Sequence, residues 1–371
     1  MTTRAKLLLL TVVIIIALVL FLEAQKPEMA RLVNKIPLSL TSSGNESARK
    51  DYLPAVELTG ISGYINTDAI SLQPLIGKKV ILVDFWTYSC INCQRTIPYL
   101  KAWYGKYQDQ GLEIIGVHTP EFDFEKKREN VAAAVQKFGI LYPVVQDNDY
   151  ATWTAYNNHY WPHKYLIDIN GFIAYDHIGE GGYDQTEQKI QELLDERMKK
   201  LAIAGTIIKD LAKPQGVVAI DTAQVSTPEI YFGSARNTSL GNGKSQMSGE
   251  QVFTEPKDLR VNNVYLSGDW DIKSEYAQNV GKTSKIILRY QAKNVYFVAS
   301  AANAVTVTLL RDGKPLQATA GEDVVVSKDT SKVNIKEDRL YTLIEDQEYG
   351  EHTLEILIEQ PGLKAFTFTF G

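Results

Sequence analysis

The sequence contains very little cysteine: Cys90 and Cys93 are the only two cysteines in 371 residues, and two residues separate them. A structural disulfide stabilises a fold mainly by restricting the unfolded chain, and the effect grows with the length of the loop that it closes. A bridge between Cys90 and Cys93 would close almost no loop. The spacing therefore indicates chemistry at this pair rather than a structural bridge.

Closely spaced cysteines can also attach haem or bind zinc, but both uses need further residues that this sequence does not place nearby. Covalent haem attachment requires a histidine directly after the second cysteine, and residue 94 is glutamine. For zinc, His159 and His163 form an H-x3-H pair, but this pair lies far beyond the usual distance from Cys93. Pro162 lies inside the pair, so the two histidines cannot share a helical face. The sequence thus excludes a haem anchor and disfavours a structural zinc site.

The chain also lacks an excess of positive charge. Its 39 Lys and Arg residues are outnumbered by 44 Asp and Glu residues, which gives a formal net charge of -5. A protein that binds nucleic acid needs a basic face to neutralise phosphate. We therefore expect no nucleic-acid partner.

Long hydrophobic runs are scarce, and the longest stands near the N-terminus. Leu7–Leu22 is apolar apart from one threonine, and Arg4 and Lys6 precede it. The run is long for a cleaved signal segment and short for a helix that crosses about 30 Å of hydrocarbon. Residues 22–24 make a poor cleavage site, and no cysteine follows for lipoprotein processing. These features favour an uncleaved single-pass anchor over a signal peptide, with the N-terminus cytoplasmic and the rest of the chain extracytoplasmic.

The next segments predict a tether and an α/β domain. Residues 25–51 are polar and without periodicity, as expected of a tether after the membrane segment at 1–24. Between residues 52 and 212, continuous apolar runs such as KVILVDFW and LEIIGVH alternate with amphipathic stretches, including helical stretches expected at about 123–139 and 185–211. Asn170-Gly171 joins two further apolar runs and predicts a β-hairpin. The order β-α-β-α-β-α-β-β-α predicts a mixed central sheet flanked by helices.

After a linker predicted at 213–226, the pattern becomes that of strands. Residues 227–371 contain short runs rich in Val, Ile, Tyr and Phe, such as KIILRYQA, NVYFVAS and AFTFTF, separated by turn signals such as Asp312-Gly313. This spacing predicts an all-β jelly roll or sandwich. The sequence alone identifies no row of sugar-binding aromatic residues there, and Tyr265, Trp270 and Tyr290 fit a core equally well.

The cysteine pair stands where a strand is expected to meet a helix. In VDFWTYSCINC, a strand and a short loop lead to a helix that begins near Cys90. The unpaired N–H groups and the positive dipole end of a helix N-terminus stabilise a thiolate. Cys90 is therefore expected to be exposed and to attack a disulfide, and Cys93, one turn inside the helix, is expected to resolve the mixed disulfide.

These residues resemble the thioredoxin superfamily. Asp84 lies six residues before the first cysteine, Pro98 lies eight residues after it, and Trp161-Pro162 precedes the hairpin, where the family has a cis-proline. The stretches FWTYSCINCQRTIPYL and GVHTPEFDFEK resemble the TlpA-like branch and, more narrowly, the C-terminal part of DipZ proteins. TPEIYFGSAR and GLKAFTFTFG resemble the carbohydrate-binding-module-like domain of the same proteins.

The resemblance implies a thiol-disulfide oxidoreductase whose redox-active disulfide needs no further cofactor. Asp84 is then the proton acceptor for Cys93, because a carboxyl buried beside the pair has a raised pKa. A cis-Pro162 packs against the disulfide and leaves the backbone of Trp161 to pair with an extended substrate. The aromatic residues expected around a substrate groove are Tyr88, Trp161 and Trp86.

The resemblance also implies partners and a direction of electron flow. It favours a reductant of disulfides in protein substrates, in cytochrome c maturation or disulfide repair. DipZ proteins usually carry a polytopic CcdA-like electron-transfer domain, whereas this chain has one hydrophobic segment. Its electrons are therefore expected from a separate CcdA-like membrane donor.

Two alternative functions stay open at this point. The first is a copper(I) metallochaperone on the same fold, with Cys90, Cys93, His163 and His159 as soft and imidazole ligands. The second is a glycan-binding or adhesion protein in which the thioredoxin unit is a scaffold and the C-terminal domain holds a glycan ligand.

Overall fold

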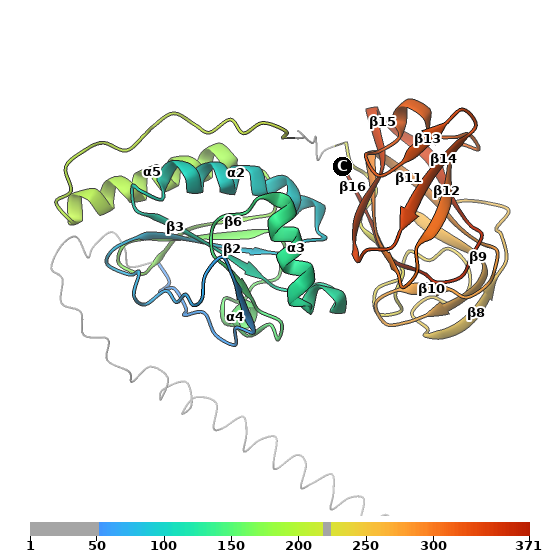
Figure 1. Ribbon diagram of the computed structural model, residues 1–371, viewed down its shortest axis with the longest axis horizontal. Coiled ribbons are helices and arrows are strands. Elements are labelled where there is room, and N and C mark those ends of the chain that lie inside the picture. Colours follow the sequence, from blue (N-terminus) through green and yellow to red (C-terminus); the bar gives the residue numbers. More distant parts are fainter. Residues whose placement is uncertain (1–51, 218–223) are drawn as a thin grey trace, which may run out of the picture. The chain divides into compact units, whose positions relative to one another are not determined.

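The computed structural model describes residues 52–217 and 224–371, which form an α/β domain followed by an all-β domain (Figure 1). The predicted membrane anchor (1–24), the predicted tether (25–51) and part of the predicted linker (218–223) lie outside the described residues. Within the described ranges, no helix has both the length and the apolar character needed to cross a membrane. The fold class predicted from the sequence is confirmed.

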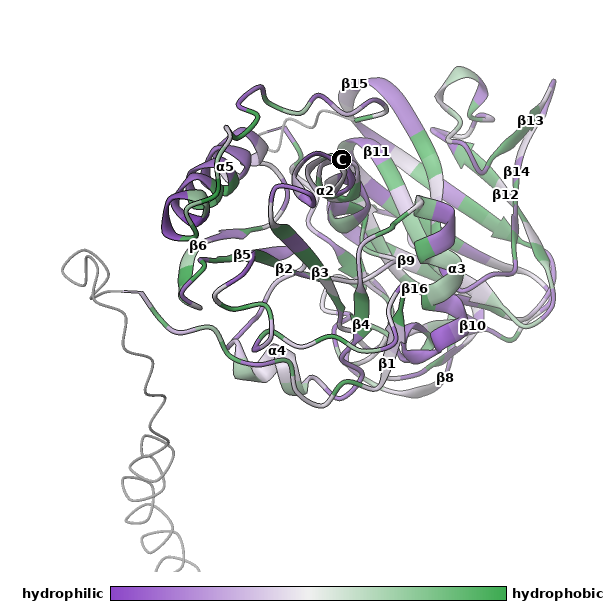
Figure 2. Ribbon diagram, turned by 60° about the vertical axis from the view of Figure 1, so that its left-hand side comes forward, coloured by the Kyte–Doolittle hydropathy of each residue, from purple (hydrophilic) through white to green (hydrophobic). Residues whose placement is uncertain are grey.

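A six-stranded mixed sheet forms the centre of the α/β domain, with the strand order β1-β4-β3-β2-β5-β6. Strand β2 pairs in parallel with β3 and antiparallel with β5. Figure 2 shows hydrophobic residues along β2 and β3, as expected for strands buried on both faces. The strands are β1 (Gly63–Ile65), β2 (Val80–Trp86), β3 (Leu112–His118), β4 (Val144–Gln146), β5 (His163–Ile167) and β6 (Ile173–Ile178).

The helices match the predicted order, with two differences in extent. They are α2 (Ile91–Tyr107), η2 (Asp123–Lys126), α3 (Arg128–Phe138), α4 (Ala151–Ala155) and α5 (Tyr183–Lys200). The stretch expected to be one helix at 123–139 is split into η2 and α3, because Lys127 has extended backbone angles. Gly139 ends α3 in the left-handed conformation, as its position predicted.

The helix expected at 185–211 ends early, at Lys200. Beyond Lys200 the chain continues without helical structure and packs against the domain. Ile207 is buried, and the Tyr107 hydroxyl donates a hydrogen bond to the Ile208 carbonyl at 3.3 Å. These tertiary contacts with α2 override the helical propensity of the segment.

Alternate residues of β2 face two different cores. Val80, Leu82 and Trp86 pack with α2, α3 and α5, whereas Ile81, Val83 and Phe85 pack with α4 and the segment at 55–76. Figure 1 shows α2 and α5 on the same face of the sheet. Because side chains alternate along a strand, Asp84 shares the face of Val80, Leu82 and Trp86. The sheet thus directs this carboxyl into the core beneath α2.

The all-β domain is built on a 10-stranded antiparallel sheet in which two long strands pair with several neighbours. Strand β11 pairs with β9 through its first half and with β16 through its second half. Its other edge pairs with β15, with a register shift between Ala292 and Asn294. Trp270, Tyr265 and Tyr290 are buried core residues. The strands are β7 (Ile230–Tyr231), β8 (Gly249–Phe253), β9 (Asn263–Ile272), β10 (Ala277–Asn279), β11 (Ser284–Ala301), β12 (Val305–Arg311), β13 (Val325–Ser327), β14 (Thr330–Ile335), β15 (Arg339–Ile358) and β16 (Leu363–Phe370).

The all-β domain contributes residues to the core of the α/β domain. Phe366 of β16 makes edge contacts with Phe122 and Phe124, at ring-centroid distances of 5.1 and 4.8 Å. Leu340 and Tyr296 belong to the same buried cluster as the inner face of α2. The all-β domain therefore packs on the elements that carry the cysteine pair.

Candidate functional site

Cys90 is the N-cap residue of α2, so it stands at the helix start that the sequence predicts. It has extended backbone angles, and its Sγ accepts a hydrogen bond from the backbone N–H of Cys93 at 3.4 Å. Its side chain is half-buried, and both cysteines are free thiols. A backbone N–H donor and the positive end of the helix dipole are therefore both directed at the Cys90 sulfur.

Cys93 is enclosed behind Cys90, with 1% of its surface exposed. Burial is the main cause that raises the pKa of the Cys93 thiol well above its ordinary value, and the nearby Cys90 and Asp84 add to the effect. The two sulfurs are therefore chemically different. Cys90 is accessible, whereas Cys93 holds its proton until a base removes it.

Arg95 lies two residues after Cys93, but its charge is already neutralised. The guanidinium donates two hydrogen bonds to the Glu180 carboxylate at 2.8 and 2.7 Å, and one to Asn92 at 2.6 Å. Since this buried guanidinium is paired, it adds little stabilisation to a thiolate at Cys90.

Asp84 and Lys164 place a buried pair of opposite charges beneath the cysteines. The two residues are direct neighbours in the β2–β5 register, and Asp84 is 2% exposed whereas Lys164 is fully buried. Burial raises the pKa of Asp84 to about 7, and the positive charge of Lys164 partly opposes this rise. A carboxyl with a pKa near neutrality can exchange a proton with Cys93.

The surroundings of this pair leave one carboxyl oxygen of Asp84 available for proton transfer. Within the described residues, Asp84 Oδ1 has no hydrogen-bond partner, and the Lys164 ammonium donates to the Gly179 carbonyl at 2.9 Å. Lys164 is a residue that the sequence reasoning missed. The signal was present, because a lysine interrupts the otherwise apolar strand His163–Ile167.

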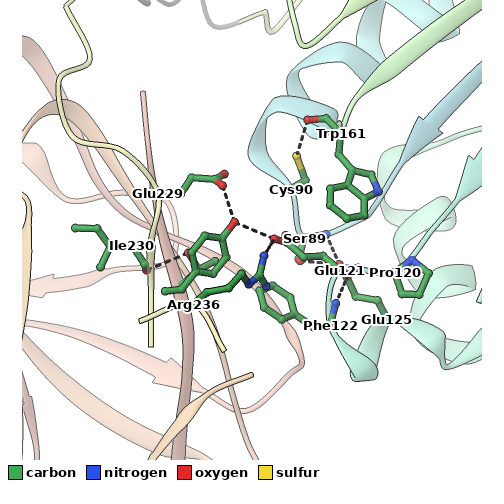
Figure 3. Close-up of polar contacts among 12 residues, drawn as sticks. Ser89, Cys90, Pro120, Glu121, Phe122, Glu125, Trp161, Glu229, Ile230 and Arg236 are labelled. Atoms are coloured by element: carbon green, nitrogen blue, oxygen red, sulfur yellow. Dashed lines mark hydrogen bonds and ion pairs between the residues drawn. The ribbon is translucent and has the colours of Figure 1, made fainter. Parts of the chain in front are cut away.

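The Trp161–Pro162 peptide bond is cis, as the resemblance predicted. It brings the Trp161 carbonyl oxygen to 4.0 Å from Cys90 Sγ (Figure 3). The indole N–H of Trp161 donates to the Thr119 carbonyl at 3.0 Å, and its ring packs on Trp153 at 4.3 Å. Trp161 is half-buried, so part of its surface remains open beside Cys90.

Of the other two aromatic residues predicted for a substrate groove, Trp86 needs correction and Tyr88 is largely covered. Trp86 is 1% exposed and packs edge-on against His118, so it supports the fold and cannot touch a substrate. Tyr88 is 4% exposed, and its hydroxyl donates to the Asp338 carbonyl of the all-β domain at 2.9 Å. The ring of Tyr88 thus packs at the contact between the two domains, and only a small part of its surface is open.

The ligand set considered for copper is not assembled. His163 begins β5 one residue before Lys164, so its side chain points to the opposite face of the sheet from Cys93. Both of its ring nitrogens are engaged, with Asn158 Oδ1 at 2.7 Å and Asp176 Oδ2 at 2.9 Å. Across residues 52–217 and 224–371, no three His, Cys, Asp or Glu side chains converge in a manner suited to a metal ion. The prediction of Cys90, Cys93, His163 and His159 as a copper site is therefore wrong.

His118 supports the loop before the cysteines as a neutral ring. It is fully buried, and burial lowers its pKa to about 3. Its Nε2 accepts a hydrogen bond from the backbone N–H of Tyr88 at 3.3 Å, and its ring stacks on that of Tyr88 at 5.7 Å. His118, at the end of β3, thus fixes the backbone of Tyr88, two residues before Cys90.

Glu125 ties the loop after β3 to the residue that precedes Cys90. Its fully buried carboxylate accepts hydrogen bonds from the Ser89 hydroxyl at 2.6 Å, the Ser89 N–H at 3.2 Å and the Phe122 N–H at 3.0 Å. Burial raises the pKa of Glu125, and the donors from Ser89 and Phe122 oppose that rise. The sequence reasoning missed this residue, because nothing in its local pattern marks a contact with Ser89.

Side chains of the all-β domain reach the same loop (Figure 3). Arg236 donates to Glu121 Oε1 at 2.7 Å, and its guanidinium lies over the Tyr231 ring at 3.8 Å. The Tyr231 hydroxyl lies 2.9 Å from Glu121 Oε1 and 2.7 Å from Glu229 Oε2, and donates to one of them at a time. Since the Glu121 N–H donates to Glu125 at 2.6 Å, the all-β domain is connected to Ser89 through two residues of one loop.

Two family models match separate parts of the chain. Residues 50–176 match the AhpC/TSA family, and residues 227–371 match a family described as a thioredoxin-like C-terminal domain. The first match contains the cysteine pair and the cis-proline, and the second covers the all-β domain.

Individual proteins are similar over different lengths. Protein DipZ of Mycobacterium tuberculosis is 39% identical over 323 residues, which are 85% of this chain and 43% of DipZ. The thiol-disulfide oxidoreductase YkuV of Bacillus subtilis is 30% identical over 143 residues, 38% of this chain and 95% of YkuV. The thiol-disulfide oxidoreductase ResA of Halalkalibacterium halodurans is 33% identical over 128 residues, 34% of this chain and 67% of ResA. The chain thus spans less than half the length of DipZ.

Proposed function

Because this chain belongs to the thioredoxin-like thiol-disulfide oxidoreductases, a family that includes YkuV and ResA, we propose that it reduces disulfides of protein substrates outside the cytoplasm. The observation that carries the proposal is the asymmetry of the two sulfurs. Cys90 is half-buried and accepts a hydrogen bond at its Sγ, whereas Cys93 is 1% exposed and lies on the face of the sheet that holds Asp84.

In the first step, the Cys90 thiolate attacks one sulfur of the substrate disulfide. The disulfide bond breaks, a mixed disulfide forms, and the second substrate sulfur leaves as a thiolate. In the second step, Asp84 accepts the proton of Cys93, and the Cys93 thiolate attacks the sulfur of Cys90. The first substrate sulfur leaves, so the substrate gains two electrons and the protein ends with a Cys90–Cys93 disulfide.

The return to the dithiol requires a donor of two electrons. We propose a separate CcdA-like membrane protein for this role, and an anchor at Leu7–Leu22 that keeps the chain beside it. In this setting the protein acts in cytochrome c maturation or in the repair of wrongly formed disulfides. The resemblance to DipZ proteins and the basic residues before the hydrophobic run support this setting.

The direction of electron flow is tested by the reduction potential of the Cys90–Cys93 pair. A strongly stabilised Cys90 thiolate makes a protein oxidising, and here Arg95 is already paired with Glu180. We expect a potential of about -250 mV or below, nearer to thioredoxin than to DsbA. Equilibration with glutathione and thioredoxin buffers measures it. A potential near about -120 mV, together with a protein found oxidised in cells, would contradict the reductive direction.

The membrane anchor is tested by fractionation. The full chain is expected in the membrane pellet, resistant to salt extraction, with protease access to the folded domains from outside. Replacing Ile15 and Val19 with arginine should release the protein, because a charge at the centre of a spanning segment costs about 3 kcal/mol. Release of the unaltered chain by high salt, or protection of its domains from external protease, would contradict the anchor.

A further inference from the structure

A cavity of about 680 Å³ lies beside the loop and the helix start that carry the cysteine pair. Tyr88 and Gln94 lie in its wall, and they flank the cysteine pair on both sides in sequence. Gln94 follows Cys90 by four residues, and its backbone N–H donates a hydrogen bond to the Cys90 carbonyl at 3.0 Å. Gln94 is fixed by a hydrogen bond from its Nε2 to the Tyr88 carbonyl at 2.8 Å. Cys90 itself is not in the lining, but Tyr88 and Gln94 on either side of it are, so the cavity lies close to the attacking sulfur.

The two domains contribute opposite walls of this cavity. The α/β domain supplies Tyr88, Gln94 and one face of α3, and the all-β domain supplies the end of β11, the turn before β15 and the start of β16. Apolar side chains line part of it. They are Ala133, Ala134, Phe138, Ala301, Ala302 and Leu340.

The charged residues of the lining are mostly basic. The lining residues with positive charge are Lys127, Lys137, Lys336, Arg339 and Lys364, and those with negative charge are Glu337 and Asp338. Lys127 pairs with Asp338 at 3.4 Å, and Arg339 pairs with Glu337 at 2.9 Å.

Three lysines of the lining keep an uncompensated charge. Among the residues that the structure describes, Lys137, Lys336 and Lys364 form no ion pair. The Lys364 ammonium lies 5.0 Å from the centroid of the Tyr276 ring, a contact that leaves its charge in place. A cluster of positive charge in a chain of net charge -5 creates a local field that attracts anions.

We propose that this cavity binds an acidic, extended segment of the substrate protein, next to the disulfide that Cys90 attacks. The proposal rests on the proposed function, because a disulfide at Cys90 requires a polypeptide that continues from it. A strand rises about 3.3 Å per residue, so an extended segment that continues from the substrate cysteine can reach the cavity within a few residues. Its apolar lining then contacts side chains that alternate with the acidic ones.

The predicted tether of this chain is a poor candidate for the same cavity. Residues 25–51 contain five Lys and Arg residues and three Asp and Glu residues. A net positive segment does not complement a basic lining, so the charge favours a separate, acidic partner.

The test uses disulfide peptides of one sequence that differ only in the residues flanking the cysteine: a run of glutamates, glutamines or lysines. The glutamate peptide is expected to react with a kcat/KM roughly tenfold above that of the glutamine peptide at low salt, mainly through KM. The lysine peptide should react more slowly than the glutamine peptide. The preference should shrink as salt is added, because exposed charges are screened.

The variant Lys137→Glu/Lys336→Glu/Lys364→Glu should abolish or invert the preference. The matched control is Lys244→Glu/Lys257→Glu/Lys282→Glu, which changes net charge equally at exposed lysines outside the cavity and should keep the preference. Hydroxyethyl disulfide, a small neutral substrate, should react equally with all three proteins. Equal rates for the three peptides, or the same loss in both triple variants, would overturn the proposal. A lack of reaction with hydroxyethyl disulfide in the unaltered protein would instead refute the proposed function.

Discussion

Cys90→Ser is expected to abolish disulfide reduction, and Cys93→Ser is expected to accumulate a covalent complex with substrate. Serine at position 90 removes the attacking thiolate, so the rate should fall by at least about 100-fold. Serine at position 93 leaves Cys90 able to attack but removes the thiol that resolves the mixed disulfide. Because Cys93 is 1% exposed, no external thiol easily replaces it. Non-reducing electrophoresis of cells that express each variant should reveal trapped partners only for Cys93→Ser.

The double variant Cys90→Ser/Cys93→Ser is the control for this experiment, since it removes both sulfurs and should trap nothing. The trapped partners also give the substrate class directly. A Cys90→Ser variant that traps as many partners as Cys93→Ser would reverse the assigned roles of the two sulfurs. Full activity of either single variant would refute the two-step mechanism.

The sequence predicted the parts of the site that depend on local spacing. The position of Cys90 at a helix start follows from a strand, a short loop and a helix that are continuous in the chain. The cis bond before Pro162 and the placement of Asp84 followed from resemblance to a family with strict spacing. In each case the residue's environment is set by its own element and by the neighbouring strand.

The sequence did not predict contacts that depend on long-range pairing. Lys164 becomes the partner of Asp84 only through the β2–β5 register, and the same register directs His163 away from the cysteines. Glu125 reaches Ser89 because the loop after β3 folds back over the start of α2. The hydrogen bond from the Tyr88 hydroxyl to the all-β domain likewise joins residues 250 positions apart. Hydrophobic periodicity specifies which face of an element is buried, but not what covers that face.

The buried pair of Asp84 and Lys164 predicts that substitution of either residue changes the rate of the resolving step. Asp84→Asn should slow the resolving step near pH 7 by on the order of 100-fold, because the amide cannot accept the Cys93 proton. Attack by Cys90 should change little, since its sulfur takes no proton from Asp84. Lys164→Met removes the charge that lowers the pKa of Asp84, so that pKa should rise above about 7 and the pH profile of resolution should shift upward. Single-turnover release of a peptide from its mixed disulfide with Cys90 measures this step.

The same pair predicts how stability depends on pH, and the direction follows from the raised pKa of Asp84. The folded state holds the proton up to pH of about 7, whereas an unfolded aspartate loses it at about pH 4. The stabilising effect of the neutral carboxyl is therefore complete below about pH 4 and is lost as pH rises through 7, by up to about 4 kcal/mol. Asp84→Asn removes this dependence, so the variant should gain stability relative to the unaltered protein as pH rises from 4 to 8.

Asp109→Asn is the matched control, since Asp109 is exposed and lies outside the site. It should leave both the resolving rate and the pH dependence of stability unchanged. Urea unfolding at several pH values gives the free energies, and Asp84→Asn/Lys164→Met completes a double-mutant cycle that isolates the coupling of the two charges. An Asp84→Asn variant that unfolds with the same pH dependence as the unaltered protein would show that Asp84 titrates normally. In that case the proton of Cys93 must go to another acceptor, and the second step of the mechanism as proposed fails.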